Sequence, residues 1–129
     1  MAEEPYSATV LDHFSNPRNA GVLENPDAVG VQSNPVCGDT MRLMLRIAEG
    51  VITEARWQTV GCPAAIATSS IASELVVGRS LADAAELTKE EIVIAAGGMP
   101  RSKLHCSVLA QDALRRALRA YHDRAARSA

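Results

Sequence analysis

The chain has 129 residues, of which 47% are apolar and 22% are charged, and its formal net charge at pH 7 is −2. This composition is typical of a globular domain with its own core, and it excludes wholesale disorder and, for lack of a basic excess, a general nucleic-acid binder. Because no apolar run reaches membrane-spanning length and the acidic start at residues 1–4 is unlike a signal peptide, we expect one domain, residues 1–129, in the cytoplasm.

The first half of the chain predicts one helix and then three strands. Residues 5–15 carry apolar side chains at helical spacing, which we expect to face the core: Tyr6, Val10, Leu11 and Phe14. Residues 16–36 are rich in Asn, Pro and Gly and predict a long connection with a short strand near residues 29–32. Apolar positions then alternate on both sides of a turn at Glu49-Gly50, which predicts an antiparallel hairpin over residues 40–60. Its second strand is expected to place four residues on one face: Val51, Thr53, Ala55 and Trp57.

The second half predicts four helices. In Gly61-Cys62-Pro63, the proline fits the first position of a helix that runs to about residue 77, which makes Cys62 its N-cap residue. Residues 80–87 predict a short helix, residues 88–91 form a capping box that opens another, and the last helix covers about residues 106–124. The predicted fold class is therefore α+β: a small three-stranded antiparallel sheet covered by helices on one face, with an N-terminal helix and a long C-terminal helix.

Three cysteines lie far apart, each beside small or polar residues: Cys37, Cys62 and Cys106. In the cytoplasm they are expected to be reduced, and therefore ligating or reactive. The last two fall at predicted helix starts, where backbone N–H groups favour a thiolate. Asp39 and His105 are candidate ligands beside two of these cysteines. Three thiolates with one oxygen or nitrogen donor predict a four-coordinate metal or cluster site that holds its metal less tightly than four thiolates would.

Each candidate also has a purely structural interpretation. A free cysteine is usually a small buried apolar residue, Asp39 could cap a turn, and His105 could be an ordinary first-turn residue. Lys103 adds positive charge beside Cys106, whereas His13 and His122 are expected at the surface. Several arginines of the last helix predict either a solvated face or a docking surface for an acidic partner: Arg115, Arg116, Arg119, Arg124 and Arg127.

Four separated motifs resemble, in the same order, those of the iron–sulfur cluster assembly scaffolds, IscU and the N-terminal domain of NifU. The first is Asp12-His13-Phe14-Ser15-Asn16-Pro17-Arg18-Asn19-Ala20-Gly21, and the others are Cys37-Gly38-Asp39, Gly61-Cys62-Pro63-Ala64-Ala65 and Lys103-Leu104-His105-Cys106-Ser107. The resemblance covers about residues 6–122 and agrees with the predicted fold class.

The resemblance implies that Cys37, Cys62 and Cys106, with Asp39 or His105 as the fourth ligand, hold a transient 2Fe–2S cluster. It further implies that a cysteine desulfurase delivers the sulfur of the cluster to Cys106 as a persulfide. A ferredoxin-like protein would supply electrons, and apo-proteins would receive the finished cluster. The chain would then be a scaffold rather than an enzyme, and cluster-loaded chains could form homo-oligomers.

Zinc provides the main alternative. Zinc and iron compete for such ligands, so the same residues could hold zinc in a sulfurtransferase that accepts persulfide from a cysteine desulfurase, or in a structural zinc domain. His105 and the short spacing of 44 residues between Cys62 and Cys106 favour the IscU branch over the zinc-dependent SufU branch.

One segment departs from the family pattern. Chaperone-assisted members carry Leu-Pro-Pro-Val-Lys before the His-Cys pair, and this chain has Met99-Pro100-Arg101-Ser102-Lys103 there. Only the first proline and the lysine match. The resemblance therefore does not carry dependence on a chaperone pair over to this chain.

Overall fold

The elements follow the predicted order in the computed structural model, which describes residues 6–35 and 38–128. They are α1 (Ala8–Ser15), β1 (Ala28–Ser33), β2 (Thr40–Ala48), β3 (Val51–Val60), α2 (Pro63–Val76), α3 (Leu81–Ala85), α4 (Lys89–Ala95), the 3-10 turn η1 (Arg101–Lys103) and α5 (His105–Ser128). The predicted α+β fold class is confirmed. The last helix reaches a few residues further than predicted. Within the described residues, no helix has the combination of length and apolarity that crossing a bilayer requires.

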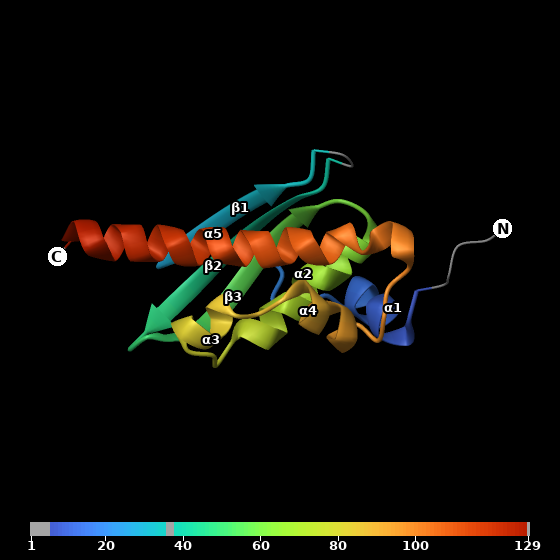
Figure 1. The fold of residues 1–129 in the computed structure, drawn as a ribbon, viewed down its shortest axis with the longest axis horizontal. Coiled ribbons are helices and arrows are strands. Elements are labelled where there is room, and N and C mark those ends of the chain that lie inside the picture. The colour runs from blue at the N-terminus through green and yellow to red at the C-terminus, as the bar shows by residue number, and fades with distance from the viewer. Residues whose placement is uncertain (1–5, 36–37, 129) are drawn as a thin grey trace.

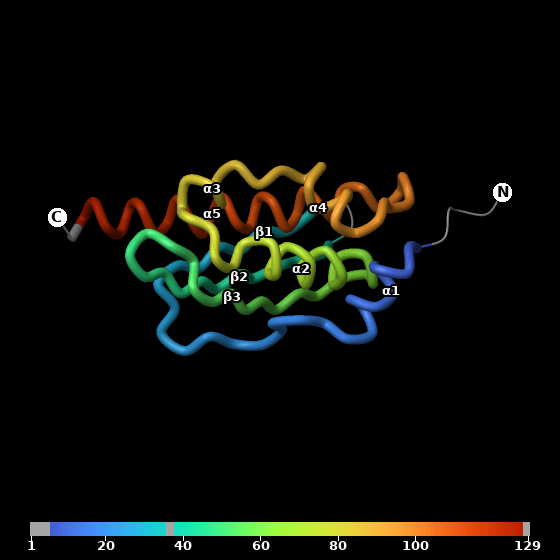
Figure 2. The backbone as a smooth tube through the Cα atoms, turned by 90° about the horizontal axis from the view of Figure 1, so that it is seen from below, coloured from blue at the N-terminus to red at the C-terminus, as the bar shows by residue number. Residues whose placement is uncertain are grey.

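The three strands form one antiparallel sheet in the order β1-β2-β3. Helix α5 runs the length of the molecule across β1 and β2, and α2 packs against β3 (Figure 1). Helix α1 packs on α2, and α4 contacts both α2 and α5. The segment between α1 and β1 runs back along the sheet (Figure 2), where residues 19–21 exchange backbone hydrogen bonds with Trp57 of β3. The outer edge of β3 is therefore partly covered.

The core is aliphatic, as the scarcity of aromatic residues suggests. Many of its fully buried side chains come from β2, β3, α2 and α5, among them Met41, Leu43, Leu45, Ile52, Val76 and Leu114. Helix α5 lies very close to β1, because a Cβ atom on Gly30 would be 2.1 Å from the Ala113 carbonyl oxygen and 2.5 Å from the Ala117 nitrogen. Glycine at position 30 thus sets the distance between the long helix and the sheet.

A β-bulge changes the predicted face of β3. Arg46 lies opposite Glu54, but Ile47 lies opposite Ile52, so Thr53 is an extra residue on this strand. Ile52 is fully buried and Thr53 is exposed. The expectation that Thr53 shares a face with Ala55 and Trp57 was wrong, because simple alternation in one strand does not reveal an extra residue.

The predicted apolar face of α1 was also wrong in part. Val10 is fully buried, but Leu11 and Phe14 are 51% and 40% exposed. His13, expected at the surface, is only 7% exposed. Its Nδ1 lies 2.7 Å from the Oγ of Ser70 on α2. The small Ser70 side chain on the facing helix leaves room for the imidazole and forms a hydrogen bond with it. A polar residue can therefore take the inward position.

The first motif of the sequence, residues 12–21, holds the segment after α1 against α2 and β3 by hydrogen bonds. The Ser70 Oγ accepts a hydrogen bond from the Arg18 backbone N–H at 2.8 Å, and the Trp57 Nε1–H donates to the Arg18 carbonyl at 2.7 Å. The Asn19 side-chain amide donates to the Ser73 Oγ at 3.1 Å. This motif therefore has a structural use that the resemblance did not show: it joins α1, α2 and β3.

We expect the burial of His13 to make stability depend on pH. Burial, reinforced by the Arg18 charge, lowers the pKa of His13 below 6.5, although Glu74 and Asp12 act in the opposite direction. The unfolded chain then binds the proton more tightly than the folded protein, so stability is complete above pH 6.5 and falls as the pH drops through the folded pKa. Urea unfolding across this range should show the decline.

The variant His13→Gln provides the control, because it can still meet the Ser70 hydroxyl but does not titrate. Its urea midpoint should change less with pH than that of the original protein. An equally steep decline in the variant would assign the pH dependence to other groups.

Candidate metal centre

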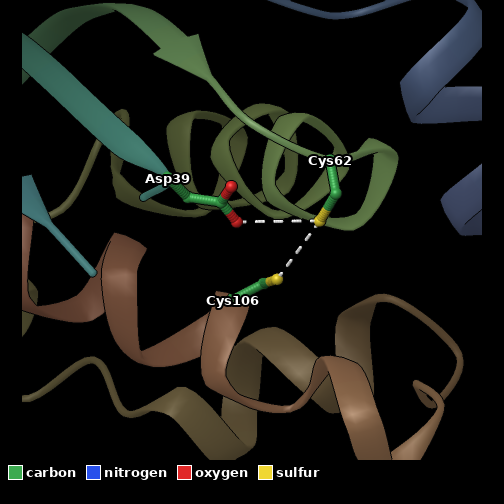
Figure 3. A group of neighbouring side chains, drawn as sticks. All are labelled: Asp39, Cys62 and Cys106. Atoms are coloured by element: carbon green, nitrogen blue, oxygen red, sulfur yellow. Dashed lines mark hydrogen bonds between the residues drawn. The ribbon is translucent and has the colours of Figure 1, made fainter. Parts of the chain in front are cut away.

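Three side chains from separate parts of the chain meet at one end of the sheet. Asp39 precedes β2, Cys62 lies between β3 and α2, and Cys106 is in the first turn of α5 (Figure 3). The Cys62 Sγ is 3.7 Å from the Asp39 Oδ2 and 3.7 Å from the Cys106 Sγ. The three candidate ligand atoms all lie within 4.8 Å of one another. The chain thus brings together two thiols and one carboxylate that are far apart in sequence.

These distances fit a tetrahedral metal ion. A metal–sulfur bond of about 2.3 Å in tetrahedral geometry requires two sulfurs about 3.8 Å apart. The observed sulfur–sulfur distance of 3.7 Å therefore needs almost no adjustment for both cysteines to bind one ion. Two soft thiolates and a harder carboxylate suit zinc or an iron of an iron–sulfur cluster, with a fourth position to be filled.

Cys62 is the N-cap residue of α2, as predicted. Its backbone is extended, with φ −72° and ψ 167°, and Pro63 occupies the first helical position. Its side chain makes no capping hydrogen bond. The thiol instead donates to the Asp39 carboxylate, so the cap residue directs its sulfur into the metal centre rather than to its own helix.

Cys106 is fully buried and is held through its backbone. The Thr68 hydroxyl on α2 lies 3.3 Å from the Cys106 carbonyl oxygen and 2.9 Å from that of Ala64. The Thr68 hydroxyl can thus donate to a carbonyl of either helix, and this contact links the start of α5 to α2. Because Cys62 begins α2, the two cysteines belong to directly connected helix ends.

Gly61 leaves space for the Asp39 carboxylate. Asp39 is only 6% exposed. A Cβ atom on Gly61 would lie 2.7 Å from both Cγ and Oδ1 of Asp39. Any side chain at position 61 would push the carboxylate away from its present place, so this glycine positions a candidate ligand.

The remaining predicted site residues stand apart from this group. Cys37 lies outside the described residues. His105 is the first residue of α5 and half-buried, and in the described part of the chain it does not belong to the group formed by Asp39, Cys62 and Cys106. Lys103 ends η1, two residues before α5. His122 is exposed, as expected.

Two residues that hold the site together, Thr68 and Gly61, were not predicted from the sequence. Thr68 lies in a run of small polar residues, and the sequence names no particular partner for it. Gly61 belongs to the motif around Cys62, but its contact with Asp39 could not be inferred from sequence. The available signal was their position: Thr68 lies within the predicted helix that follows Cys62, and Gly61 directly precedes Cys62.

Comparison with known proteins agrees with the motifs. Residues 5–128 match the family model described as NifU-like N terminal domain. The chain is 49% identical over 113 residues to the iron–sulfur cluster assembly scaffold protein IscU 1 of Archaeoglobus fulgidus, which covers 88% of this chain and 74% of that protein. It is 45% identical over 120 residues to the scaffold protein IscU of Azotobacter vinelandii, covering 90% and 93% of the two chains.

A solved structure shows the same fold. The N-terminal NifU-like protein of Brucella abortus superposes with a TM-score of 0.72 at 20% sequence identity, over 91% of this chain and 94% of that chain. At this identity the likeness supports the fold alone. Family membership follows from the sequence match over nearly the whole chain: this protein belongs to the NifU-like N-terminal domain family.

Proposed function

We propose that this chain is a scaffold on which a transient 2Fe–2S cluster is built and from which it is released. The names of its relatives as iron–sulfur cluster assembly scaffolds support this function. The observation that carries the proposal is the convergence of Cys62, Cys106 and Asp39 within 4.8 Å. In this function the cluster is cargo, so a ligand set weaker than four thiolates suits release as well as capture.

The proposed ligands are Cys37, Cys62 and Cys106, with Asp39 or His105 as the fourth. The geometry supports three of these five residues directly, and the family motifs support the other two. Asp39 is the better placed candidate for the fourth position, because its carboxylate lies 3.7 Å from the Cys62 sulfur.

Cys106 is the proposed sulfur acceptor. Its thiolate would attack the outer sulfur of a persulfide on a cysteine desulfurase. The persulfide S–S bond breaks, the outer sulfur stays on Cys106, and the desulfurase cysteine leaves as a thiolate. Lys103, close by in sequence, would favour the negatively charged form. Because Cys106 is fully buried, this step requires the chain around it to move when the desulfurase docks.

The further partners in this proposal are a ferredoxin-like electron donor and apo-proteins that accept the cluster. The chain itself acts as a carrier rather than an enzyme. We propose one scaffold domain, residues 1–129, working in the cytoplasm, where the cysteines stay reduced. The zinc-bound sulfurtransferase is not favoured, because the relatives are named as scaffolds.

Anaerobic reconstitution with ferrous iron and sulfide tests the function. The expected product is a coloured protein with the visible absorption of a 2Fe–2S cluster, which then disappears as an apo-ferredoxin acquires a cluster. A protein that stays colourless, retains zinc and accelerates desulfurase turnover would support the sulfurtransferase and overturn the scaffold.

The variant Asp39→Ala should release its cluster more slowly. The carboxylate is a harder and more exchangeable donor than a thiolate, so it lowers the barrier to ligand exchange. We expect transfer to an apo-ferredoxin to slow by about tenfold. Stopped-flow absorption measures the rate, and Asp39→Glu, which keeps a carboxylate, should restore part of it. Transfer at the original rate in Asp39→Ala would exclude this role.

A further inference from the structure

A groove of about 650 Å³ lies between β1 and α5, away from the metal centre. One wall is four consecutive strand residues, Val29–Gln32, and the other is the face of α5 that carries Arg115, Arg116 and Arg119. The helix residues on this wall recur at helical spacing, so they form one stripe beside the strand. We call this the β1–α5 groove.

The strand that lines this groove is the open edge of the sheet. Within the described residues, β1 pairs with β2 alone, whereas β3 has backbone contacts with residues 19–21 on its outer side. Antiparallel pairing leaves alternate N–H and C=O groups of an edge strand pointing away from the sheet. An extended chain laid in the groove could pair with those groups.

The arginines of the groove belong to a helix whose net charge is opposite in sign to that of the rest of the protein. Helix α5 contains five arginines and two aspartates, a net charge of +3, which leaves −5 for the rest of a chain whose total is −2. Arg115, Arg116 and Arg119 are exposed, and in the described part of the chain none forms a salt bridge. Arg116 instead contacts the Gln32 side chain across the groove.

Two aspartates limit where a negative partner can lie. Asp112 and Asp123 also line the groove, at positions that lie beyond the arginines along the helix in both directions. A long uniform polyanion would meet both carboxylates, but a short acidic segment placed over the arginines would not. The pattern therefore favours a peptide with a few spaced acidic side chains over a nucleic-acid backbone.

We propose that the β1–α5 groove binds an extended acidic segment of a partner protein, which adds to the sheet as a strand beside β1. Alternate side chains of such a strand face the same way, so two acidic residues separated by one position would both face the arginine stripe. Guanidinium–carboxylate hydrogen bonds then add affinity and direction to the backbone pairing. Arg119 is 13 residues from Cys106, or about 20 Å along the helix, so this surface is separate from the metal centre.

A capped peptide of alternating glutamate and threonine provides the probe. Titration into the isotope-labelled protein, followed by NMR, should give a dissociation constant of about 0.1 mM. Chemical shift changes should centre on residues 29–33 and 112–123. Added strand pairing should also slow hydrogen exchange of β1 amides, and raised salt should weaken binding.

Two matched comparisons isolate the two parts of the proposal. Arg119→Glu should weaken binding by about tenfold or more, because it places like charges together, whereas Arg127→Glu makes the same charge change on the same helix outside the groove and should have little effect. A peptide of identical sequence with alternate amides N-methylated keeps its charge but cannot pair as a strand, and it should bind about tenfold more weakly.

Several results would overturn the proposal. These are no binding at about 1 mM peptide, equal losses in Arg119→Glu and Arg127→Glu, undiminished binding of the N-methylated peptide, or shift changes centred elsewhere. A polyuridine oligonucleotide that occupies the groove as tightly as the peptide would assign the surface to nucleic acid instead.

Discussion

Replacing Gly30 with alanine should destabilise the fold by about 3 kcal/mol, a large part of the stability of a domain this size. The added methyl would lie 2.1 Å from the Ala113 carbonyl oxygen and 2.5 Å from the Ala117 nitrogen. Both are backbone atoms in the middle of a long helix, so neither can turn aside as a flexible side chain would. Relief requires α5 to move off β1, which opens the core around Leu114.

Urea unfolding followed by circular dichroism measures the loss. Val31→Ala is the control on the same strand, because Val31 is 43% exposed and its truncation should cost far less. Cobalt binding at the metal centre should survive in whatever fraction of Gly30→Ala remains folded. A variant with an unchanged urea midpoint would show that α5 and β1 separate at little cost.

Replacing Gly61 with alanine should have the opposite profile, with a large effect on metal binding and a small one on stability. The new methyl would lie 2.7 Å from the Asp39 carboxylate carbon and from its Oδ1. These atoms end a side chain that can rotate, so the carboxylate moves and the fold persists. We expect affinity for Co²⁺, a coloured substitute for zinc or ferrous iron, to fall by about 10- to 100-fold.

A double-mutant cycle shows whether the loss passes through Asp39. In a protein that already carries Asp39→Ala, the Gly61→Ala change should lower cobalt affinity little further, because no carboxylate remains to be displaced. Additive losses would mean that Gly61 acts on the cysteines instead. Absorption titration gives the affinities, and urea unfolding should place Gly61→Ala within about 1 kcal/mol of the original protein.

Helix starts, including the one at the metal centre, could be predicted because they depend on local chemistry. Pro63 at the first helical position and Thr88 at an N-cap are decided by which N–H groups and side chains are available within one turn. The structure shows both: Pro63 is the first residue of α2, and the Thr88 hydroxyl accepts from the Glu91 N–H at the start of α4. For the same reason the α+β order could be read from periodicity and turn residues.

The features that the sequence did not reveal depend on partners far along the chain. His13 is buried because Ser70, 57 residues later, offers a hydroxyl 2.7 Å away. The bulge at Thr53 becomes visible only when β3 is paired with β2. The burial of Ser69, Ser70 and Ser73 depends on distant partners in the same way, since α1, β3 and α5 all pack against α2.

Helix α5 has 24 residues, contains the buried Cys106 in its first turn and lines the β1–α5 groove with its middle part. It is about 36 Å long and lies against the sheet for much of that length. A partner held in the groove would be attached to one rigid helix that also carries Cys106, a proposed ligand. If a flexible segment of that partner reached the metal centre, the groove would raise the local concentration of this segment there. A scaffold could thus favour one recipient over others without any new contact at the metal centre itself.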